Sequence, residues 1–144
     1  MVAFLDTSTL VKLYHYEVES EKLSRLISEN VSEIFLSEIA KVEFVSAVWK
    51  KVRMKNLDEQ IAKEVIKCFE SDKMQFSWIK TDTGLIEMAQ NLFSKYGLTT
   101  LRTLDALQLA SCLSAKNRVD VFLTHDDFLN VLFQKEGLNT QFNS

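Results

Sequence analysis

The sequence predicts an α/β fold, a three-layer sandwich with a central, mainly parallel sheet of four or five short strands flanked by helices. Short apolar runs with strand character alternate along the chain with longer segments whose apolar residues repeat at helical spacing. The 144 residues include no proline and three glycines, which indicates long helices, short connections and no linker. We therefore expect residues 1–144 to form one domain.

The first half of the chain begins with a strand signal and then alternates helix and strand patterns. Val2–Leu5 is an apolar run that ends at Asp6, and 32–37 (SEIFLS) is a second short run between polar residues. The spacing of apolar residues predicts helices over 8–15, 18–29, 38–54 and 57–71. Asp58 is the expected N-cap of the last of these helices, because its side chain can accept a hydrogen bond from the first turn.

The second half continues the same alternation. Residues 74–80 (MQFSWIK) alternate with a period of two and predict a weaker strand, and 119–124 (VDVFLT) is a β-branched strand candidate. Helices are expected over 83–96, 103–116 and 126–136. Thr103 is the expected N-cap of the middle helix, and Gly97 is expected to end the preceding helix in the left-handed conformation. Residues 138–142 are the candidate for a final edge strand.

Composition and charge limit the possible functions without selecting one. Twenty acidic and seventeen basic residues give a net charge of −3, which does not indicate a nucleic-acid binder, but acids in a metal site are neutralised locally by the ion. Cys68 and Cys112 are far apart and lack metal-ligand spacing, which is typical of reduced, packed thiols. No apolar run approaches the ~20 residues that span a bilayer, and the N-terminus lacks signal-peptide features. We expect a cytoplasmic protein with no membrane association.

Four carboxylates occupy positions where α/β folds collect functional groups. In such folds, ligands bind at the carboxyl ends of the strands, where the following loops and helices begin. Asp6 and Asp126 each follow a strand candidate, and Asp105 lies one turn into a helix that is otherwise rich in Leu and Ala. Glu43 lies among apolar residues of a long helix. If these acids are functional, we expect them to meet at one edge of the sheet.

Each acid also has a structural interpretation. Asp6 and Asp105 fit a helix cap or a helix-dipole partner, Asp126 fits an exposed loop acid, and Glu43 fits an exposed stripe shared with Lys50. Acids are nevertheless rarely buried unless they are paired or bound to a metal. Converged carboxylates repel one another unless a cation lies among them, and an oxygen-only set of ligands suits Mg²⁺ or Mn²⁺. Four acids at compatible positions favour a shared metal site.

Four segments resemble, in order and spacing, the motifs of PIN-domain nucleases: FLDTSTLVKLY, SEIAKVEFVSAVWKK, YGLTTLRTLDALQLASCL and VFLTHDDF. The resemblance spans essentially the whole chain and is closest to the VapC toxins of toxin–antitoxin pairs. It places the acidic quartet of the family on Asp6, Glu43, Asp105 and Asp126 and implies that they are catalytic and metal-binding. Such proteins are Mg²⁺- or Mn²⁺-dependent endoribonucleases, usually homodimers, each inhibited by a small antitoxin protein.

Hydroxyl and acidic neighbours of the quartet are candidates for supporting roles. Ser8 and Thr124 are expected to orient carboxylates or bound waters. Asp127 directly follows Asp126, and we expect it to act, if at all, as a fifth ligand through a water molecule. The resemblance carries the hydroxyl of the motif group onto Ser8 and Thr124.

Basic residues near the acids are candidate RNA contacts. Lys50 lies two turns beyond Glu43 on about the same helix face, Lys51 follows it, and Arg102 lies one turn before Asp105. The alternative roles are cations at a helix C-terminus for the lysines and an ion-pair partner of Asp105 for Arg102. The sequence thus predicts a metal-dependent endoribonuclease, the toxin of a toxin–antitoxin pair. The alternative is a degenerate PIN domain that binds protein or RNA without catalysis.

Overall fold

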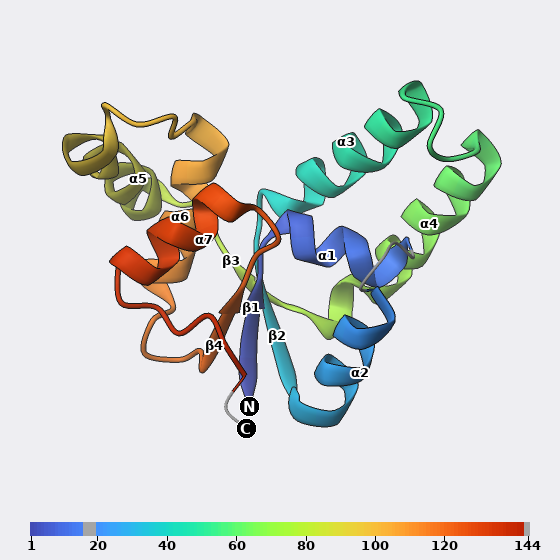
Figure 1. Ribbon diagram of the computed structural model, residues 1–144, viewed down its shortest axis with the longest axis horizontal. Helices are drawn as coiled ribbons and strands as arrows, with labels where there is room; N and C mark the ends of the chain where they lie inside the picture. The colour runs from blue at the N-terminus through green and yellow to red at the C-terminus, as the bar shows by residue number, and fades with distance from the viewer. Residues whose placement is uncertain (16–19, 143–144) are drawn as a thin grey trace.

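The computed structural model describes residues 1–15 and 20–142 and contains a parallel four-stranded sheet with helices on both faces (Figure 1). The strands are β1 (Val2–Leu5), β2 (Glu33–Ser37), β3 (Ser77–Ile79) and β4 (Val121–Leu123), in the order β3-β2-β1-β4. The helices are α1 (Thr7–Tyr14), α2 (Ser20–Asn30), α3 (Ala40–Arg53), α4 (Glu59–Asp72), α5 (Thr83–Tyr96), α6 (Thr103–Ser114) and α7 (Asp127–Lys135), with a 3₁₀ turn at Lys73–Gln75. This arrangement confirms the predicted α/β sandwich.

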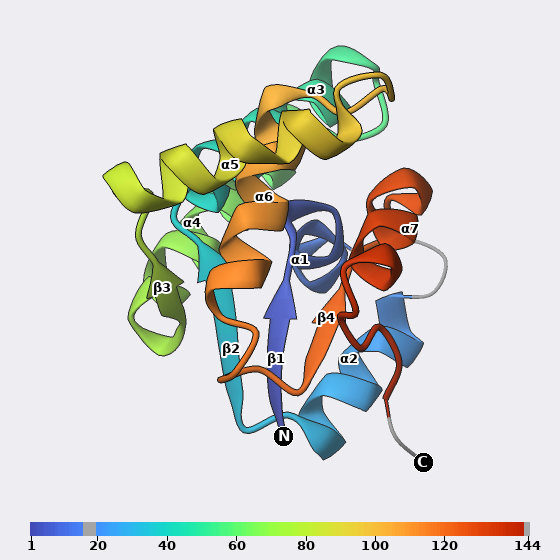
Figure 2. The ribbon, with the colours of Figure 1, turned by 90° about the vertical axis from the view of Figure 1, so that its left-hand side faces the viewer.

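The register of the strands sorts their side chains onto two faces of the sheet. Phe4 pairs with Phe35 of β2 and with Phe122 of β4, so these rings lie in a row on the face covered by α5, α6 and α7. Ala3 and Leu5 point to the opposite face, which α1 to α4 cover (Figures 1 and 2). The sheet therefore separates two hydrophobic clusters.

The strands end at one edge of the sheet, and the helices that carry the acids begin there. β1 leads into α1, β2 into α3 and β4 into α7. The chain returns through α5, so that α6 also starts at this edge (Figure 2). The connections thus place Asp6, Glu43, Asp105 and Asp126 on the same side of the molecule.

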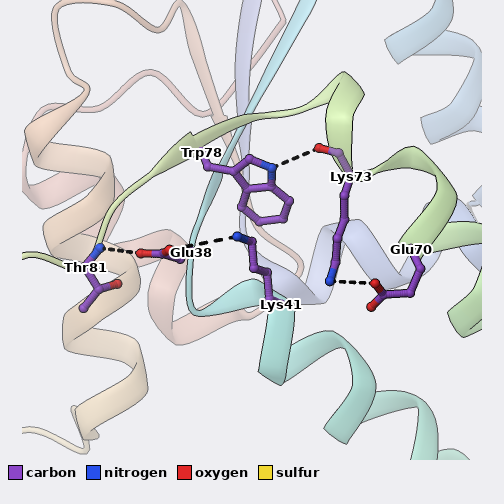
Figure 3. A network of polar contacts seen from close by, with 6 residues as sticks. All are labelled: Glu38, Lys41, Glu70, Lys73, Trp78 and Thr81. Carbon is purple, nitrogen blue, oxygen red and sulfur yellow. Dashed lines mark hydrogen bonds and ion pairs between the residues drawn. The ribbon is translucent and has the colours of Figure 1, made fainter.

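A polar network fixes the start of α3 against the exit of β3 (Figure 3). Glu38 accepts a hydrogen bond from the backbone N–H of Thr81 at 3.1 Å, and its other carboxylate oxygen lies 3.9 Å from Nζ of Lys41. The Lys41 ammonium also lies 4.7 Å from the centroid of a Trp78 ring. Because Glu43 is in the first turn of α3, these contacts help to set its position relative to the sheet.

Element boundaries agree with the sequence prediction to within a few residues, with one missing strand. Residues 138–142 do not form a strand. The N–H of Phe122 donates to the carbonyl of Asn139 at 2.8 Å, as it would to a neighbouring strand. The Asn139 side chain, however, donates to the carbonyls of Asp120 and Gln141, and these bonds stand where a strand would have backbone hydrogen bonds. Residues 18–19 of the second expected helix lie outside the described residues.

Two predicted helix caps are wrong. Gly97 is right-handed, with φ −63°, and its N–H continues the helical bonding to the carbonyl of Phe93, whereas the left-handed glycine is Gly137, with φ +77°. Thr103 is the first helical residue of α6, and the N-cap is Arg102, whose N–H bonds to the side chain of Asp105. Among the residues that the structure describes, no helix has the length and apolar character to cross a membrane.

Candidate functional site

A small cavity of about 120 Å³ at the carboxyl edge of the sheet brings the four predicted acids together. Asp6 comes from the end of β1, Glu43 from α3, Asp105 from α6, and Asp126 from the turn between β4 and α7. The complete lining is Asp6, Thr7, Ser8, Glu43, Asp105, Gln108, Asp126 and Leu129. The structure therefore places the predicted quartet around one space, although its residues are up to 120 positions apart in the chain.

Asp6 is the most buried acid of the site, with 3% of its surface exposed. Its Oδ1 accepts hydrogen bonds from the hydroxyl of Ser8 at 2.7 Å and from the N–H of Thr9 at 3.0 Å. Its Oδ2 accepts from the hydroxyl of Thr124 at 2.5 Å, and its own N–H bonds to the carbonyl of Leu123. Asp6 thus caps α1 and also joins the ends of β1 and β4.

Burial raises the pKa of Asp6 from 3.8 to about 6, because the ionised carboxylate is poorly solvated at this position. The hydrogen bonds from Thr124, Ser8 and the Thr9 backbone act in the opposite direction, since they stabilise the charged form. The negative charge of Glu43 adds to the rise. In the absence of a cation, the Asp6 carboxyl therefore gains a proton at mildly acidic pH.

Glu43 is half-buried and is held through one of its two oxygens. Its Oε1 accepts a hydrogen bond from the hydroxyl of Thr7 at 2.9 Å and from Nε2 of Gln108 at 2.7 Å. Burial raises the pKa of Glu43, the two hydrogen bonds lower it, and the charge of Asp105 raises it. Both hydrogen bonds leave Oε2 unused, so this oxygen can take a different partner.

Asp105 and Asp126 each bond to the backbone of their own helix start. Oδ2 of Asp105 accepts from the N–H of Arg102 at 3.3 Å. Oδ1 of Asp126 accepts from the N–H of Leu129 at 2.9 Å and caps α7, while the N–H of Asp126 donates to Oγ1 of Thr124. The capping interpretation is therefore correct for Asp6, and Asp105 bonds back to the N-cap residue of its helix. Asp126, expected as an exposed loop acid, is exposed and also caps α7.

The described residues contain no ready-made group of three or more His, Cys, Asp or Glu side chains that could hold a metal ion. The donor set nevertheless fits a hard divalent cation, since carboxylates line the cavity and His and Cys do not. In addition, the buried Oε1 of Gln108, a cavity residue, has no hydrogen-bond partner among the described residues.

The predicted supporting residues take different positions. Ser8 and Thr124 both donate to Asp6, and Ser8 also accepts from the N–H of His125 at 2.9 Å. Asp127 is the exposed first residue of α7 and is not part of the cavity lining. The structure thus places both hydroxyls in contact with Asp6, although only Ser8 lines the cavity, and leaves Asp127 outside it.

The three predicted basic residues differ in whether they line a hollow next to the acidic cavity. Lys50 lines an apolar groove of about 640 Å³ that shares Thr7, Ser8 and Glu43 with the acidic cavity. Arg102 is exposed and lines a neighbouring hollow together with Glu43 and Asp105. Lys51 is half-buried on α3 and lines neither space.

Sequence reasoning assigned no role to Thr7 or Gln108, which hold Glu43. The available signal for Gln108 was an amide in an apolar helix, three residues after Asp105 and therefore on about the same helix face. For Thr7, the signal was its place in a run of three hydroxyl residues directly after Asp6.

Comparison with known proteins gives one family and several similar structures. Residues 3–131 match the PIN domain family. A comparison with curated protein sequences found no match. The match covers every segment that contributes a lining residue to the acidic cavity.

The similar solved structures include proteins of toxin–antitoxin systems. VapC20 of Mycobacterium tuberculosis, described as a toxin that cleaves the sarcin–ricin loop, has a TM-score of 0.69 and 14% identity over 90% of this chain and 94% of its own. VapBC-1 from nontypeable Haemophilus influenzae has a TM-score of 0.63 and 15% identity, with 98% and 97% covered. VapBC2 of Rickettsia felis, bound to a DNA fragment from its promoter, has a TM-score of 0.61 and 16% identity over both whole chains. At these identities, the similarity concerns the fold.

The stability of the metal-free protein should contain a pH-dependent contribution from Asp6. Between pH 3.8 and about 6, the folded state holds a proton that the unfolded state has already released, so the unfolding free energy falls as pH rises. The loss is about 3 kcal/mol once pH exceeds the folded pKa. Urea unfolding in EDTA from pH 3.5 to 7.5, compared with Asp6→Asn, isolates this contribution. Parallel curves for the two proteins would contradict it.

Proposed function

The chain belongs to the PIN-domain family, and on this basis we propose that it is a Mg²⁺- or Mn²⁺-dependent endoribonuclease that hydrolyses RNA phosphodiester bonds. The observation that carries the proposal is the convergence of Asp6, Glu43, Asp105 and Asp126 on one cavity. We assign these four side chains as the catalytic and ion-holding groups. Binding without catalysis, as in a degenerate PIN domain, is less well supported, because all four acids are present.

The residues of the chain would prepare the site before substrate arrives. Ser8 and Thr124 hold both oxygens of Asp6 in place, and we assign them this positioning role. A bound Mg²⁺ or Mn²⁺ would orient and activate water and neutralise charge that develops on the phosphate oxygens. Asp127 lies outside the cavity, so any contribution from it would act through a water molecule.

Basic side chains flank the cavity on two sides and are proposed as RNA contacts. Lys50 lines the apolar groove on one side, and Arg102 lines the hollow on the other. An RNA backbone that crosses the cavity would pass both cations, which attract phosphates and offset the negative field of the acids. Lys51, half-buried next to Lys50, is proposed as a weaker third contact.

A small protein antitoxin is the proposed partner, since similar folds occur in toxin–antitoxin complexes. We propose the apolar groove between α1 and α3 as its docking surface. The groove exposes Val42 at 74% and is otherwise lined largely by apolar side chains, among them Val11, Ile39, Ala47 and Leu104. A partner segment with apolar side chains and a basic group would match both the groove and the acids at its end. A homodimer is the proposed form of the toxin itself.

Replacement of a quartet acid should abolish RNA cleavage and leave the fold intact. Asp6→Asn and Glu43→Gln are each expected to reduce cleavage about 100-fold or more, because loss of a ligand exceeds the 10- to 100-fold typical of outer partners. The control Glu64→Gln, an exposed acid of α4, should cleave like the wild type. EDTA should stop cleavage and Mn²⁺ should restore it. Full activity of Asp6→Asn, or of the wild type in EDTA, would refute the proposal.

Removal of the flanking cations should weaken RNA binding and its dependence on salt. In an Asp6→Asn background, Lys50→Ala combined with Arg102→Ala should reduce the slope of log affinity against log salt by about 1.4, or about 0.7 per phosphate contact. Fluorescence anisotropy with a labelled single-stranded RNA measures this slope. Lys63→Ala, which removes a surface lysine paired with Glu59, is the matched control. An unchanged slope in the double variant would exclude these contacts.

Capture of a partner should depend on the apolar groove. The full chain, tagged and expressed in its native host, should co-purify a small protein, and Val42→Asp should lose most of it because a charge then faces an apolar contact. Val131→Asp provides a control on α7, where the native side chain is 47% exposed. Equal capture by both variants would place the partner elsewhere, and no capture by the wild type would contradict the antitoxin proposal.

A further inference from the structure

Gln108 is a buried amide in a helix whose buried residues are mostly apolar. It lies in α6, three residues after Asp105, and 3% of its surface is exposed. Its neighbours Leu109 and Ala110 are fully buried and belong to the hydrophobic core. A buried amide at such a position needs hydrogen-bond partners, so its contacts indicate what it does.

The donor end of Gln108 contacts the groups that hold Glu43. Nε2 donates to Oε1 of Glu43 at 2.7 Å and to Oγ1 of Thr7 at 3.2 Å. The Thr7 hydroxyl in turn donates to the same Oε1 at 2.9 Å. Two donors from two different helices therefore occupy one oxygen of Glu43 and fix the rotation of its carboxylate.

These contacts also determine which way the amide of Gln108 faces. If the amide were turned over, its carbonyl oxygen would meet the Glu43 carboxylate, and two acceptors would repel each other. The carbonyl Oε1 is therefore directed away from Oε1 of Glu43. It is buried and has no hydrogen-bond partner among the described residues.

Gln108 lines the same cavity of about 120 Å³ as the four acids, so the amide that holds Oε1 of Glu43 belongs to the acidic site. The cavity is polar and large enough for water molecules.

We propose that Gln108 is a positioning residue of the acidic site. Its Nε2, together with the Thr7 hydroxyl, holds Oε1 of Glu43 so that the other carboxylate oxygen is available to a divalent cation. The inference rests on the proposed function, since it assigns a role within the same site. It adds a residue that acts through Glu43 and does not require Gln108 to touch the substrate.

The test is Mn²⁺ binding to the full chain, measured by calorimetry with MnCl₂ alone. Gln108→Met keeps the side-chain length and removes both polar ends, and it should weaken Mn²⁺ affinity about tenfold. Gln108→Asn keeps an amide that is too short to reach Glu43 and should give the same loss. Ser111→Ala, which removes another buried polar group of α6 that bonds to Ser37, is the control and should leave affinity unchanged.

Two further readouts separate positioning from packing. The melting temperature of Gln108→Met in EDTA should fall no more than that of Ser111→Ala, whereas a purely structural amide would lower stability and spare Mn²⁺ affinity. Excess Mn²⁺ should restore RNA cleavage by Gln108→Met. Thr7→Val should also weaken Mn²⁺ binding. In the double variant with Gln108→Met, the loss of Mn²⁺ affinity should be smaller than the product of the two single losses, because both side chains act on one oxygen of Glu43.

The outcomes distinguish this inference from the proposed function. If the wild type binds Mn²⁺ and cleaves RNA while both Gln108 variants bind Mn²⁺ within twofold of it, the inference alone is wrong. If Ser111→Ala weakens Mn²⁺ binding as much as they do, the effect is one of packing and the inference is also wrong. If the wild type binds no Mn²⁺, the proposed function fails and the inference fails with it.

Discussion

The burial of one carboxylate at the carboxyl edge of the sheet is the constraint on which the site depends. The register of β1 against β4 places Asp6 beside Thr124, where little of the Asp6 surface is exposed. A buried charge without donors is costly, and the chain supplies them from Ser8 and Thr9 in α1 and from Thr124 after β4. The hydroxyl residues around Asp6 are therefore explained by its burial, and they join the exits of two adjacent strands through a single side chain.

The same logic extends to the other acids, each of which has its own protein donors. Glu43 is held by Thr7 and Gln108, while Asp105 and Asp126 bond to backbone N–H groups at helix starts. Each of the four acids therefore keeps at least one protein hydrogen bond at the cavity. The structural and functional interpretations of these residues are thus compatible, since the hydrogen bonds use one oxygen of Glu43, Asp105 and Asp126, and Oδ2 of Asp6, with a single donor, keeps acceptor capacity.

The sequence predicts the fold well because the strands are apolar runs and the helices have regular spacing. Acids such as Asp6 and Glu43 could be found because a charge interrupts these patterns. Gln108 could not, since an amide is a weaker interruption and its partners Thr7 and Glu43 are 101 and 65 residues away in the chain. The N-cap of α6 was misplaced for a related reason: Thr103 is the better capping residue, but the Asp105 side chain bonds back to the N–H of Arg102.

The apolar groove and the acidic cavity share Thr7, Ser8 and Glu43, so an occupant of one lies next to residues that line the other. A protein segment seated in the groove would cover the side of Glu43 that an RNA chain must approach. Lys50 lies along the same groove, and the same segment would remove a proposed phosphate contact from solution. Inhibition by such a partner would need no change in the fold and no distortion of the acids. Under the proposed function, competition for one surface would therefore be sufficient for an antitoxin to block RNA.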